Sequence, residues 1–256
     1  MSSKPTFVCV PGGSCTPRFY QPSASRLSEL GYSSMLIDLP TVDAKPAKYD
    51  FSEDVKAIRD AVKTLVEEEE KEVIVVAHSY GGVTVSEAVH ESFGKRQRED
   101  NGRKGGVLRM VFISSFPLPE GAAPGGERGD TSKFLPLQII DVEVISVGDA
   151  KSQFFHDLPD DEASRWATEE VKPQSLGVFW SKTTYAAWRH IPTTYLICTN
   201  DRVVPLAAAE GMIAAARQIQ PTAFDVVEKV ESGHFAMLSK MEETVAVLRR
   251  AAGEEI

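Results

Sequence analysis

The chain has 256 residues, of which 42% are hydrophobic and 25% are charged, with no marked compositional bias. Disordered and fibrous proteins have different compositions, so a globular protein is expected. Acidic residues outnumber basic ones, 37 against 28, and the net charge is −9. This balance argues against nucleic acid as a partner, because phosphate backbones bind basic surfaces.

The sequence shows no sign of a membrane segment or of secretion. Residues 1–5 lead straight into an apolar run, with no signal-peptide core before it. No later stretch approaches the ~18 unbroken apolar residues that a membrane-spanning helix needs. We therefore expect a cytoplasmic protein with no membrane partner.

The three cysteines, Cys9, Cys15 and Cys198, are too few and too irregularly spaced for a disulfide framework or a zinc site. Cys9 and Cys198 fall inside apolar runs, where a buried and inert thiol is expected. Neither a metal site nor a cofactor is predicted.

Apolar, strand-like runs alternate with amphipathic segments along most of the chain. Strands are predicted at 7–10, 34–39, 73–77, 107–114, 194–198 and 224–230. Helices are predicted at 20–31, 51–69, 206–219 and 245–252, with a further helix directly after residue 82. The run at 73–77 is continuously apolar, which is typical of a central parallel strand covered by helices on both faces.

Two segments interrupt this alternation. The charged run at 95–104 predicts an exposed loop. The stretch 117–191 begins with clustered glycines and prolines and continues with helical segments, so we interpret it as a cap inserted over the sheet. The whole pattern predicts one α/β domain spanning 1–256, built on a doubly wound, mostly parallel sheet with an inserted helical cap.

The strongest local signal is the motif AHSYGG at 77–82, which lies between the strand at 73–77 and a helix. A turn this sharp forces the central Ser79 into a strained backbone geometry and requires small residues two positions away on each side. Ala77 and Gly81 satisfy that requirement. The pattern predicts a nucleophile elbow with Ser79 as the nucleophile; a serine on a surface loop is the alternative.

A serine hydroxyl needs a base within hydrogen-bonding reach. In the chain order that such sites use, the histidine comes last, and His234 is favoured because it follows the final strand directly after a glycine. The other histidines are expected to be structural, namely His90, His156 and His190, and His78 is expected to point to the opposite side of the turn.

The predicted acid is Asp201, directly after the strand at 194–198, at the carboxyl end where the active-site groups of parallel sheets gather. Its position between Ser79 and His234 in the chain agrees with this role. Asp225, at the start of the last strand, is the reserve candidate.

The negative charge of a tetrahedral intermediate needs preorganised N–H donors. The predicted donors are the backbone N–H of Tyr80, after the nucleophile, and that of Gly13, in the turn after the first strand. Ser14 and Cys15 could line the mouth of this site, and a purely structural role is the alternative for each.

The substrate pocket is expected to be largely apolar. Aromatic residues in and around the inserted segment could form its walls, although aromatics at helical spacing more often belong to a core. These aromatics are Phe116, Phe154, Phe155, Trp166, Phe179, Trp180 and Trp188. The residues selected as pocket candidates are Gly12, Ser14, Cys15, Phe116, Trp180 and Phe235.

These residues together resemble the plant methylesterase and hydroxynitrile lyase family of α/β-hydrolases, which includes methyl salicylate and methyl jasmonate esterases. The likeness covers most of the chain. It is carried by residues 7–15 (first strand and oxyanion turn), 77–82 (elbow), 171–176 (cap-to-sheet segment), 197–201 with Pro205 (acid loop) and 234–238 (histidine turn).

The resemblance implies a cap-covered pocket and hydrolysis of a small ester without metal or cofactor. Pro11 stands where a histidine is usual before the oxyanion glycine. Phe235 follows His234 where hydroxynitrile lyases carry a lysine that handles cyanide. The second departure argues against cyanohydrin cleavage.

The sequence therefore predicts a serine hydrolase that cleaves a small, mostly apolar carboxylic ester or lactone through an acyl-enzyme. The same triad could serve lactone formation, C–C bond hydrolysis or a lyase-like reaction, which product analysis would distinguish. A non-catalytic small-molecule receptor on a hydrolase scaffold is a second alternative, because fold does not fix function. The expected partner is a small-molecule substrate, and the sequence is compatible with a homodimer.

Overall fold

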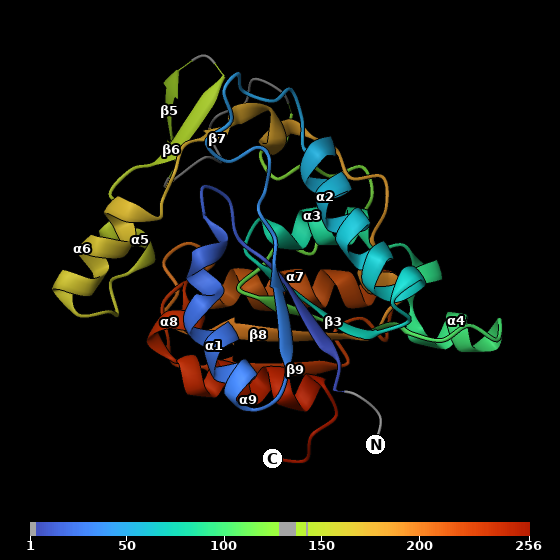
Figure 1. Ribbon diagram of the computed structural model, residues 1–256. Helices are drawn as coiled ribbons and strands as arrows, with labels where there is room; N and C mark the ends of the chain where they lie inside the picture. The colour runs from blue at the N-terminus through green and yellow to red at the C-terminus, as the bar shows by residue number, and fades with distance from the viewer. Residues whose placement is uncertain (1–3, 128–136, 142) are drawn as a thin grey trace.

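The computed structural model describes residues 4–127, 137–141 and 143–256. Its main sheet has the strand order β2-β1-β3-β4-β8-β9, and every neighbouring pair is parallel (Figure 1). The strands are β1 (Thr6–Val10), β2 (Ser33–Leu36), β3 (Glu72–His78), β4 (Gly106–Ile113), β8 (Thr193–Cys198) and β9 (Val226–Val230). The predicted strands are all present, which confirms the predicted parallel sheet.

Helices cover both faces of this sheet, as a doubly wound fold requires. One face carries α1 (Gln21–Glu29), α8 (Ala236–Ser239) and α9 (Met241–Ala251). The other carries α2 (Ser52–Lys63), α3 (Gly81–Ala88) and α7 (Leu206–Ile219). Shorter elements are the π-helical turn η2 (Thr64–Glu68), the 3₁₀ helices η1 (Pro17–Tyr20) and η3 (Glu91–Phe93), and the helix α4 (Lys95–Asp100).

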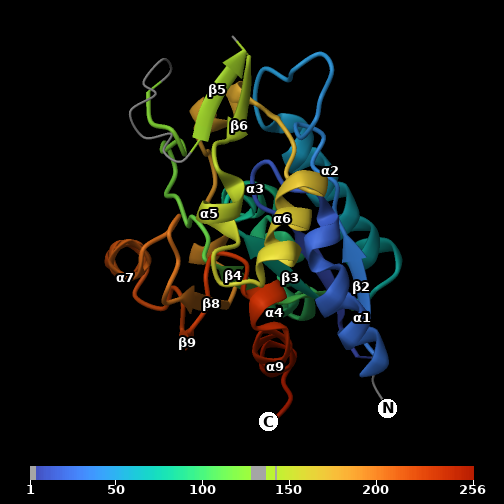
Figure 2. The same ribbon diagram turned by 90° about the vertical axis from the view of Figure 1, so that its left-hand side faces the viewer.

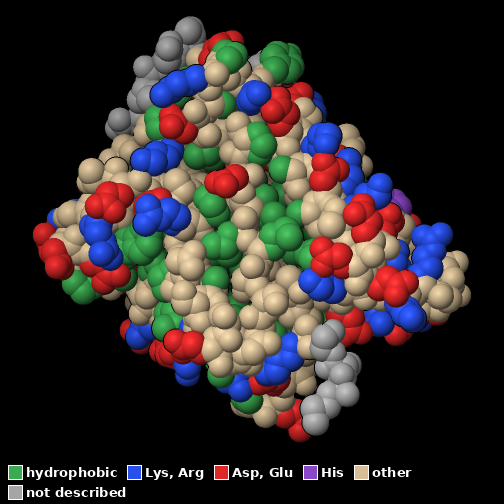
Figure 3. Space-filling view, in the orientation of Figure 1, with side chains coloured by type: hydrophobic (Ala, Val, Ile, Leu, Met, Phe, Trp, Pro, Cys, Tyr) green, Lys and Arg blue, Asp and Glu red, His purple; other side chains and the backbone are tan. Residues whose placement is uncertain are grey.

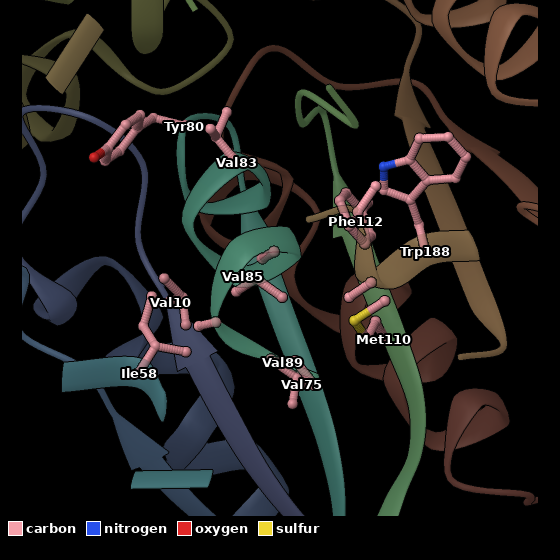
Figure 4. Close-up of a cluster of buried hydrophobic side chains, with 14 of the residues drawn as sticks. Val10, Ile58, Val75, Tyr80, Val83, Val85, Val89, Met110, Phe112 and Trp188 are labelled. Atoms are coloured by element: carbon pink, nitrogen blue, oxygen red, sulfur yellow. The ribbon is translucent and has the colours of Figure 1, made fainter. Parts of the chain in front are cut away.

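Alternate residues of the central strands face two separate hydrophobic cores. In β3, Val73, Val75 and Ala77 face the core under α2 and α3. Figure 4 shows Val75 in this core. Ile74 and Val76 face the core under α1 and α9. All five side chains are fully buried, which is why residues 73–77 are all apolar instead of alternating between apolar and polar.

The described elements between β4 and β8 lie toward the carboxyl ends of the strands, with β5, β6 and β7 at the top of Figure 1 and α5 and α6 at its left, while the C-terminus lies at the opposite end (Figures 1 and 2). Its helices are α5 (Ala150–Phe154), α6 (Asp160–Glu169), η4 (Leu176–Trp180) and η5 (Ala187–Arg189). It also contains an antiparallel sheet that the sequence did not predict, formed by β5 (Leu137–Asp141), β6 (Val144–Val147) and β7 (Gln174–Ser175). The insertion is therefore mixed and not purely helical.

The predicted exposed loop at 95–104 is wrong, because its first part is the helix α4. Arg98 in this helix is only 4% exposed despite its charge. Its guanidinium donates hydrogen bonds to the carbonyl oxygens of Val66, at 3.0 Å, and Lys104, at 2.8 Å. A run of charges does not reveal that one arginine will satisfy carbonyl groups of a neighbouring turn.

The surface is mainly polar. In Figure 3, hydrophobic side chains gather in the centre of the face shown, below the insertion, and charged side chains surround them. Among the described residues, the exposed large apolar side chains are Tyr49, Ile219, Val226 and Ile256. No helix in the described ranges combines the length and the apolar character that crossing a bilayer requires.

Candidate active site

Four loops that carry predicted site residues leave the same edge of the main sheet. Gly13 follows β1, Ser79 follows β3, Asp201 follows β8 and His234 follows β9. Because these strands are parallel neighbours or are separated only by β4, their carboxyl ends lie along one edge. This is the position where parallel sheets build their binding sites.

Ser79 lies in a strained turn between β3 and α3. Its φ angle is +51°, in the left-handed region that non-glycine residues rarely adopt. β3 ends at His78 and α3 begins at Gly81, so only two residues connect strand and helix. Ser79 is 9% exposed. This is the backbone geometry that the AHSYGG motif predicts.

The strand next to β3 holds this turn in place. The hydroxyl of Ser115, just after β4, donates to the carbonyl oxygen of Ser79 at 2.7 Å, and the N–H of Phe116 donates to the same oxygen at 3.3 Å. A Cβ on Gly82 would lie 2.1 Å from Ser115 Oγ. The second glycine of the motif therefore leaves room for a hydroxyl that fixes the turn.

Asp201 and His234 are hydrogen-bonded to each other. His234 Nδ1 lies 2.7 Å from Asp201 Oδ2, and both side chains are at most 1% exposed. Asp201 Oδ1 accepts the N–H groups of Val203, at 2.7 Å, and Val204, at 3.0 Å.

These contacts fix the state of the pair. Burial alone would raise the pKa of Asp201, but the electrostatic interaction and the hydrogen bond with His234, with the backbone donors, lower that pKa below its ordinary value. Asp201 is therefore a carboxylate that accepts the Nδ1–H of His234. Nε2 is then the ring nitrogen of His234 that can act on a hydroxyl.

The reserve acid, Asp225, is excluded by its position. It precedes β9, at the amino end of the strands, opposite the edge that carries Ser79. There its carboxylate binds Arg109, with two contacts of 2.8 Å, and accepts the N–H of Thr193 at 3.0 Å. Asp225 therefore links neighbouring strands.

Strand alternation predicted that His78 points to the opposite side of the turn, and this prediction is wrong. The Nε2–H of His78 donates to the backbone oxygen of His234 at 2.9 Å, and the two rings are 4.5 Å apart between centroids. Burial, followed by the electrostatic interaction with His234, lowers the pKa of His78 well below its ordinary value. His78 is therefore a neutral donor that supports the loop of His234.

The other histidines lie elsewhere. His90 and His190 stack on the two sides of Tyr185, at centroid distances of 5.0 and 5.3 Å. His190 also contacts Glu91 at 3.2 Å. His156 is half-buried between α5 and α6. None of these three has a hydrogen bond to Ser79 or Asp201 among the contacts of the described residues.

The turn after β1 packs directly against the turn that holds Ser79. A Cβ on Gly12 would lie 3.0 Å from the Cβ of Ser79, and a Cβ on Gly13 would lie 3.4 Å from the Cβ of Tyr80. An added Cβ would also lie 2.9 Å from His78 Nδ1 at Gly12 and 2.8 Å from Gln174 Oε1 at Gly13, so a side chain at either position would have to displace a neighbouring side chain. The two residues predicted to donate N–H groups, Gly13 and Tyr80, are thus neighbours.

Ser14 and Cys15 have structural partners. Ser14 has a φ of +60°, and its N–H donates to Gln174 Oε1 at 2.8 Å. Cys15 is 2% exposed, and its thiol donates to the carbonyl oxygen of Gly13 at 3.1 Å. Burial raises the pKa of this thiol well above its ordinary value. A substrate contact by either side chain stays a prediction.

Phe235 and Trp180 occupy different parts of the molecule. Phe235 is 1% exposed and packs in an aromatic cluster with Phe19, Phe154 and Phe155, next to the ring of His234. Trp180 ends η4 and is partly buried against the core under α2 and α3. Their contact with a substrate stays a prediction, as does that of Phe116.

The insertion contacts both loops of the Asp201–His234 pair. Asp157, between α5 and α6, accepts the N–H of Gly233 at 2.5 Å, next to His234. Arg202, next to Asp201, donates to the carbonyl oxygen of Ser152 at 2.9 Å. Sequence reasoning missed these contacts, because nothing in a local pattern indicates which loop an insertion will touch.

Sequence reasoning also missed two buried polar residues beside the site, Asp54 and Gln174. Asp54 accepts the hydroxyl of Tyr80, and Gln174 binds Ser14. A signal for Asp54 was present: it lies one helical turn before Ile58, on the apolar stripe of its helix, where a carboxylate needs buried partners. No such signal marks Gln174.

No metal centre accompanies these residues in the part of the chain that the structure describes. A group of three or more His, Cys, Asp or Glu side chains that could hold a metal ion does not occur there.

Comparisons with known proteins agree with this architecture. Residues 7–247 match the model of the alpha/beta hydrolase family. The alpha/beta hydrolase nvfD of Aspergillus novofumigatus (strain IBT 16806) is 31% identical over 255 residues, which cover 99% of this chain and 98% of that protein.

Two solved structures have the same fold at low sequence identity. A pyrethroid hydrolase from Sphingobium faniae JZ-2 has a TM-score of 0.71 and 16% identity, with 97% of each chain covered. Polyneuridine aldehyde esterase has a TM-score of 0.72 and 16% identity, with 96% of this chain and 98% of that chain covered.

Proposed function

Because this chain belongs to the alpha/beta hydrolase family, and is an enzyme of that class, we propose that it cleaves a small, mostly apolar carboxylic ester or lactone by serine catalysis. The observation that carries the proposal is the 2.7 Å contact between His234 Nδ1 and Asp201 Oδ2, on the sheet edge where Ser79 occupies its strained turn. The similarity in fold to polyneuridine aldehyde esterase also supports an ester substrate.

In the proposed first step, the Nε2 of His234 takes the proton of the Ser79 hydroxyl while Oγ attacks the carbonyl carbon of the substrate. The tetrahedral intermediate then collapses, the bond to the leaving oxygen breaks, and His234 returns the proton to that oxygen. Ser79 is left as an acyl ester. Water attacks this ester with His234 again as the base, which releases the acid and restores the serine.

The proposed role of Asp201 follows from its contacts. A carboxylate that accepts the Nδ1–H of His234 keeps Nε2 unprotonated in the resting state. It also stabilises the imidazolium that forms when the proton of Ser79 is taken. The backbone donors on Asp201 Oδ1 hold the carboxylate in one orientation, so the imidazole is held as well.

The proposed oxyanion donors are the backbone N–H groups of Gly13 and Tyr80. The charge that develops on the carbonyl oxygen is stabilised by donors that are already in position, and removal of one such donor costs about 2.7–4 kcal/mol of transition-state stabilisation. The close packing of the two turns supports this assignment. The aromatic side chains of Phe116, Trp180 and Phe235 are proposed as parts of the apolar pocket.

Covalent labelling tests the nucleophile. The wild-type protein is incubated with a fluorophosphonate probe, and the labelled peptide is identified by mass spectrometry. We expect one label, on Ser79, and hydrolysis of p-nitrophenyl butyrate by the same protein. Ser79→Ala should abolish both, while Ser23→Ala, which removes another buried hydroxyl, should abolish neither.

Two results would contradict the proposal. The first is folded wild-type protein that neither takes the label nor hydrolyses any ester or lactone of a panel with short acyl groups. The second is a label on another residue, with the activity of Ser79→Ala preserved.

A further inference from the structure

A buried set of hydrogen bonds lies behind the turns of Gly13 and Tyr80. Its centre is the carboxylate of Asp54, on α2, which is fully buried. Asp54 Oδ1 accepts the N–H of Thr41 at 3.0 Å. Asp54 Oδ2 accepts the hydroxyls of Thr41, at 2.7 Å, and Tyr80, at 2.9 Å. Three donors on one buried carboxylate make a well-defined fixed point.

The first arm of this set ends at the turn of Ser79. The side chain of Tyr80 extends away from Val83 and the rest of α3, as Figure 4 shows. Its ring packs near Phe179, at a centroid distance of 6.0 Å, and its hydroxyl reaches Asp54. The residue that carries one proposed oxyanion donor is therefore held by its backbone in the turn and by its side chain on α2.

The second arm ends at the turn after β1. Gln174, on β7 of the insertion, is 1% exposed. Its Nε2 donates to Thr41 Oγ1 at 3.0 Å, and its Oε1 accepts the N–H of Ser14 at 2.8 Å. A Cβ on Gly13 would lie 2.8 Å from the same Oε1. The amide of Gln174 thus lies directly against the residue that carries the other proposed donor.

We propose that Asp54, Thr41 and Gln174 are positioning residues that hold the N–H groups of Gly13 and Tyr80 where an oxyanion can accept both. The proposal rests on the function proposed above. These three side chains act through the two turns and need no contact with substrate. Three separate segments of chain, on α2, before α2 and in the insertion, thereby set the geometry of one small site.

The charge state of Asp54 is compatible with this role. Burial raises the pKa of Asp54 to about 6, while the hydrogen bonds from Thr41 and Tyr80 act in the opposite direction. At neutral pH the group is therefore mainly a carboxylate, which can accept all three donors. An amide or a protonated carboxyl at this position would present an N–H or O–H donor to neighbours that are themselves donors, so one of the hydrogen bonds would be lost.

The decisive variant is Tyr80→Phe, which removes one hydroxyl and leaves the backbone N–H intact. We expect kcat for p-nitrophenyl butyrate to fall about tenfold, less than the factor of 10²–10³ for loss of a whole donor, because the donor is displaced and not removed. KM should stay within about twofold, since the ground-state ester makes weaker use of the donors.

The Ki of a transition-state analogue provides a second test, because this Ki would not change if the Tyr80 hydroxyl contributed only to the stability of the fold. A trifluoromethyl ketone forms a hemiketal with Ser79, and its oxyanion needs both donors. Its Ki should rise by the same factor as kcat/KM falls. The matched control is Tyr32→Phe, which also removes a hydroxyl bound to a carboxylate, that of Glu254, on a side chain that is 4% exposed. It should leave kcat, KM and Ki unchanged.

A double-variant cycle tests the second arm. Gln174→Met keeps the length of the side chain but loses both hydrogen bonds, and it should lower kcat with little change in KM. If both arms meet at Thr41 and Asp54, the loss in Tyr80→Phe/Gln174→Met should be smaller than the product of the two single losses.

The outcomes separate this inference from the proposed function. Wild-type protein that neither hydrolyses esters nor labels at Ser79 overturns both. An active wild type, with kcat and Ki of Tyr80→Phe within about twofold of its own values, overturns the positioning role alone. If Gln174→Met does not fold, the kinetics of Tyr80→Phe still test the positioning role, because the twofold limit on kcat and Ki applies to that variant alone.

Discussion

Gly81 lies so close to Pro11 that a Cβ added to it would be 2.6 Å from the carbonyl oxygen of Pro11. Both partners are backbone, so neither can rotate away from the other. The start of α3 and the turn after β1 are therefore packed backbone to backbone.

Gly81→Ala should push these two turns apart. We expect a loss of about 1–3 kcal/mol in the free energy of unfolding, the usual cost of overpacking, together with a loss of ester hydrolysis. Urea unfolding measures the first and p-nitrophenyl butyrate the second. Gly211→Ala in α7, where an added Cβ meets nothing within 4 Å, is the control and should stabilise the protein by about 0.5–1 kcal/mol. Equal behaviour of the two variants would contradict the packing argument.

Asp201→Asn should retain the fold and lose nearly all turnover. An amide oxygen can still accept the N–H groups of Val203 and Val204, but an amide N–H facing His234 favours the wrong tautomer of the imidazole. We expect kcat to fall by about 10⁴. Steady-state kinetics measure the loss, and the thermal midpoint shows that the fold is intact. Asp225→Asn, which removes the charge that pairs with Arg109 and keeps an oxygen that can accept the N–H of Thr193, should change kcat by less than about threefold, and a similar loss in both variants would remove Asp201 from the proposed triad.

The free energy of unfolding should depend on pH through the protonation of Asp54. Its folded-state pKa is raised to about 6 from an ordinary value of 3.8, so the folded protein binds the proton more tightly than the unfolded chain. The resulting stabilisation is fully present below 3.8 and is lost as the pH rises through about 6. Relative to Asp54→Asn, wild type should therefore gain about 1 kcal/mol between pH 8 and pH 5. Urea unfolding of both proteins at several pH values checks this, and parallel curves would contradict it.

The three thiols should be unreactive in the native protein. Cys9, Cys15 and Cys198 are all at most 2% exposed, and burial raises the pKa of Cys9 to about 12 and that of Cys198 to about 11. Because the thiolate is the reactive form, Ellman's reagent should titrate no thiol in the folded state and three in guanidinium chloride. A thiol that reacts equally fast in both conditions would show that its site opens.

Local patterns were sufficient to predict the main sheet and to place the loops of Ser79, Asp201 and His234 at one of its edges. The apolar runs of β3 and β8 are buried on both faces, so their composition reports their place directly. The positions of Ser79, Asp201 and His234 follow from the rule that loops at carboxyl strand ends meet. The same rule excludes Asp225 once the direction of β9 is known.

Contacts between distant segments could not be predicted in this way. His78 supports the loop of His234 across 156 residues of chain, and Gln174 reaches Ser14 across 160. The strands of the insertion are short, down to two residues in β7, and short strands have no readable periodicity. These features depend on how the insertion folds over the sheet, which spacing alone does not encode.

The contacts of Gln174 with Ser14 and of Asp157 with Gly233 have a consequence for evolution and for engineering. Exchanging this covering segment for one from a homologue is an obvious way to alter substrate preference. In this protein such a chimera would also remove an amide and a carboxylate that bind two loops of the proposed reaction centre. Grafts that preserve both side chains should retain turnover. The residues of this segment that line the proposed pocket can therefore vary, as long as Gln174 and Asp157 are kept.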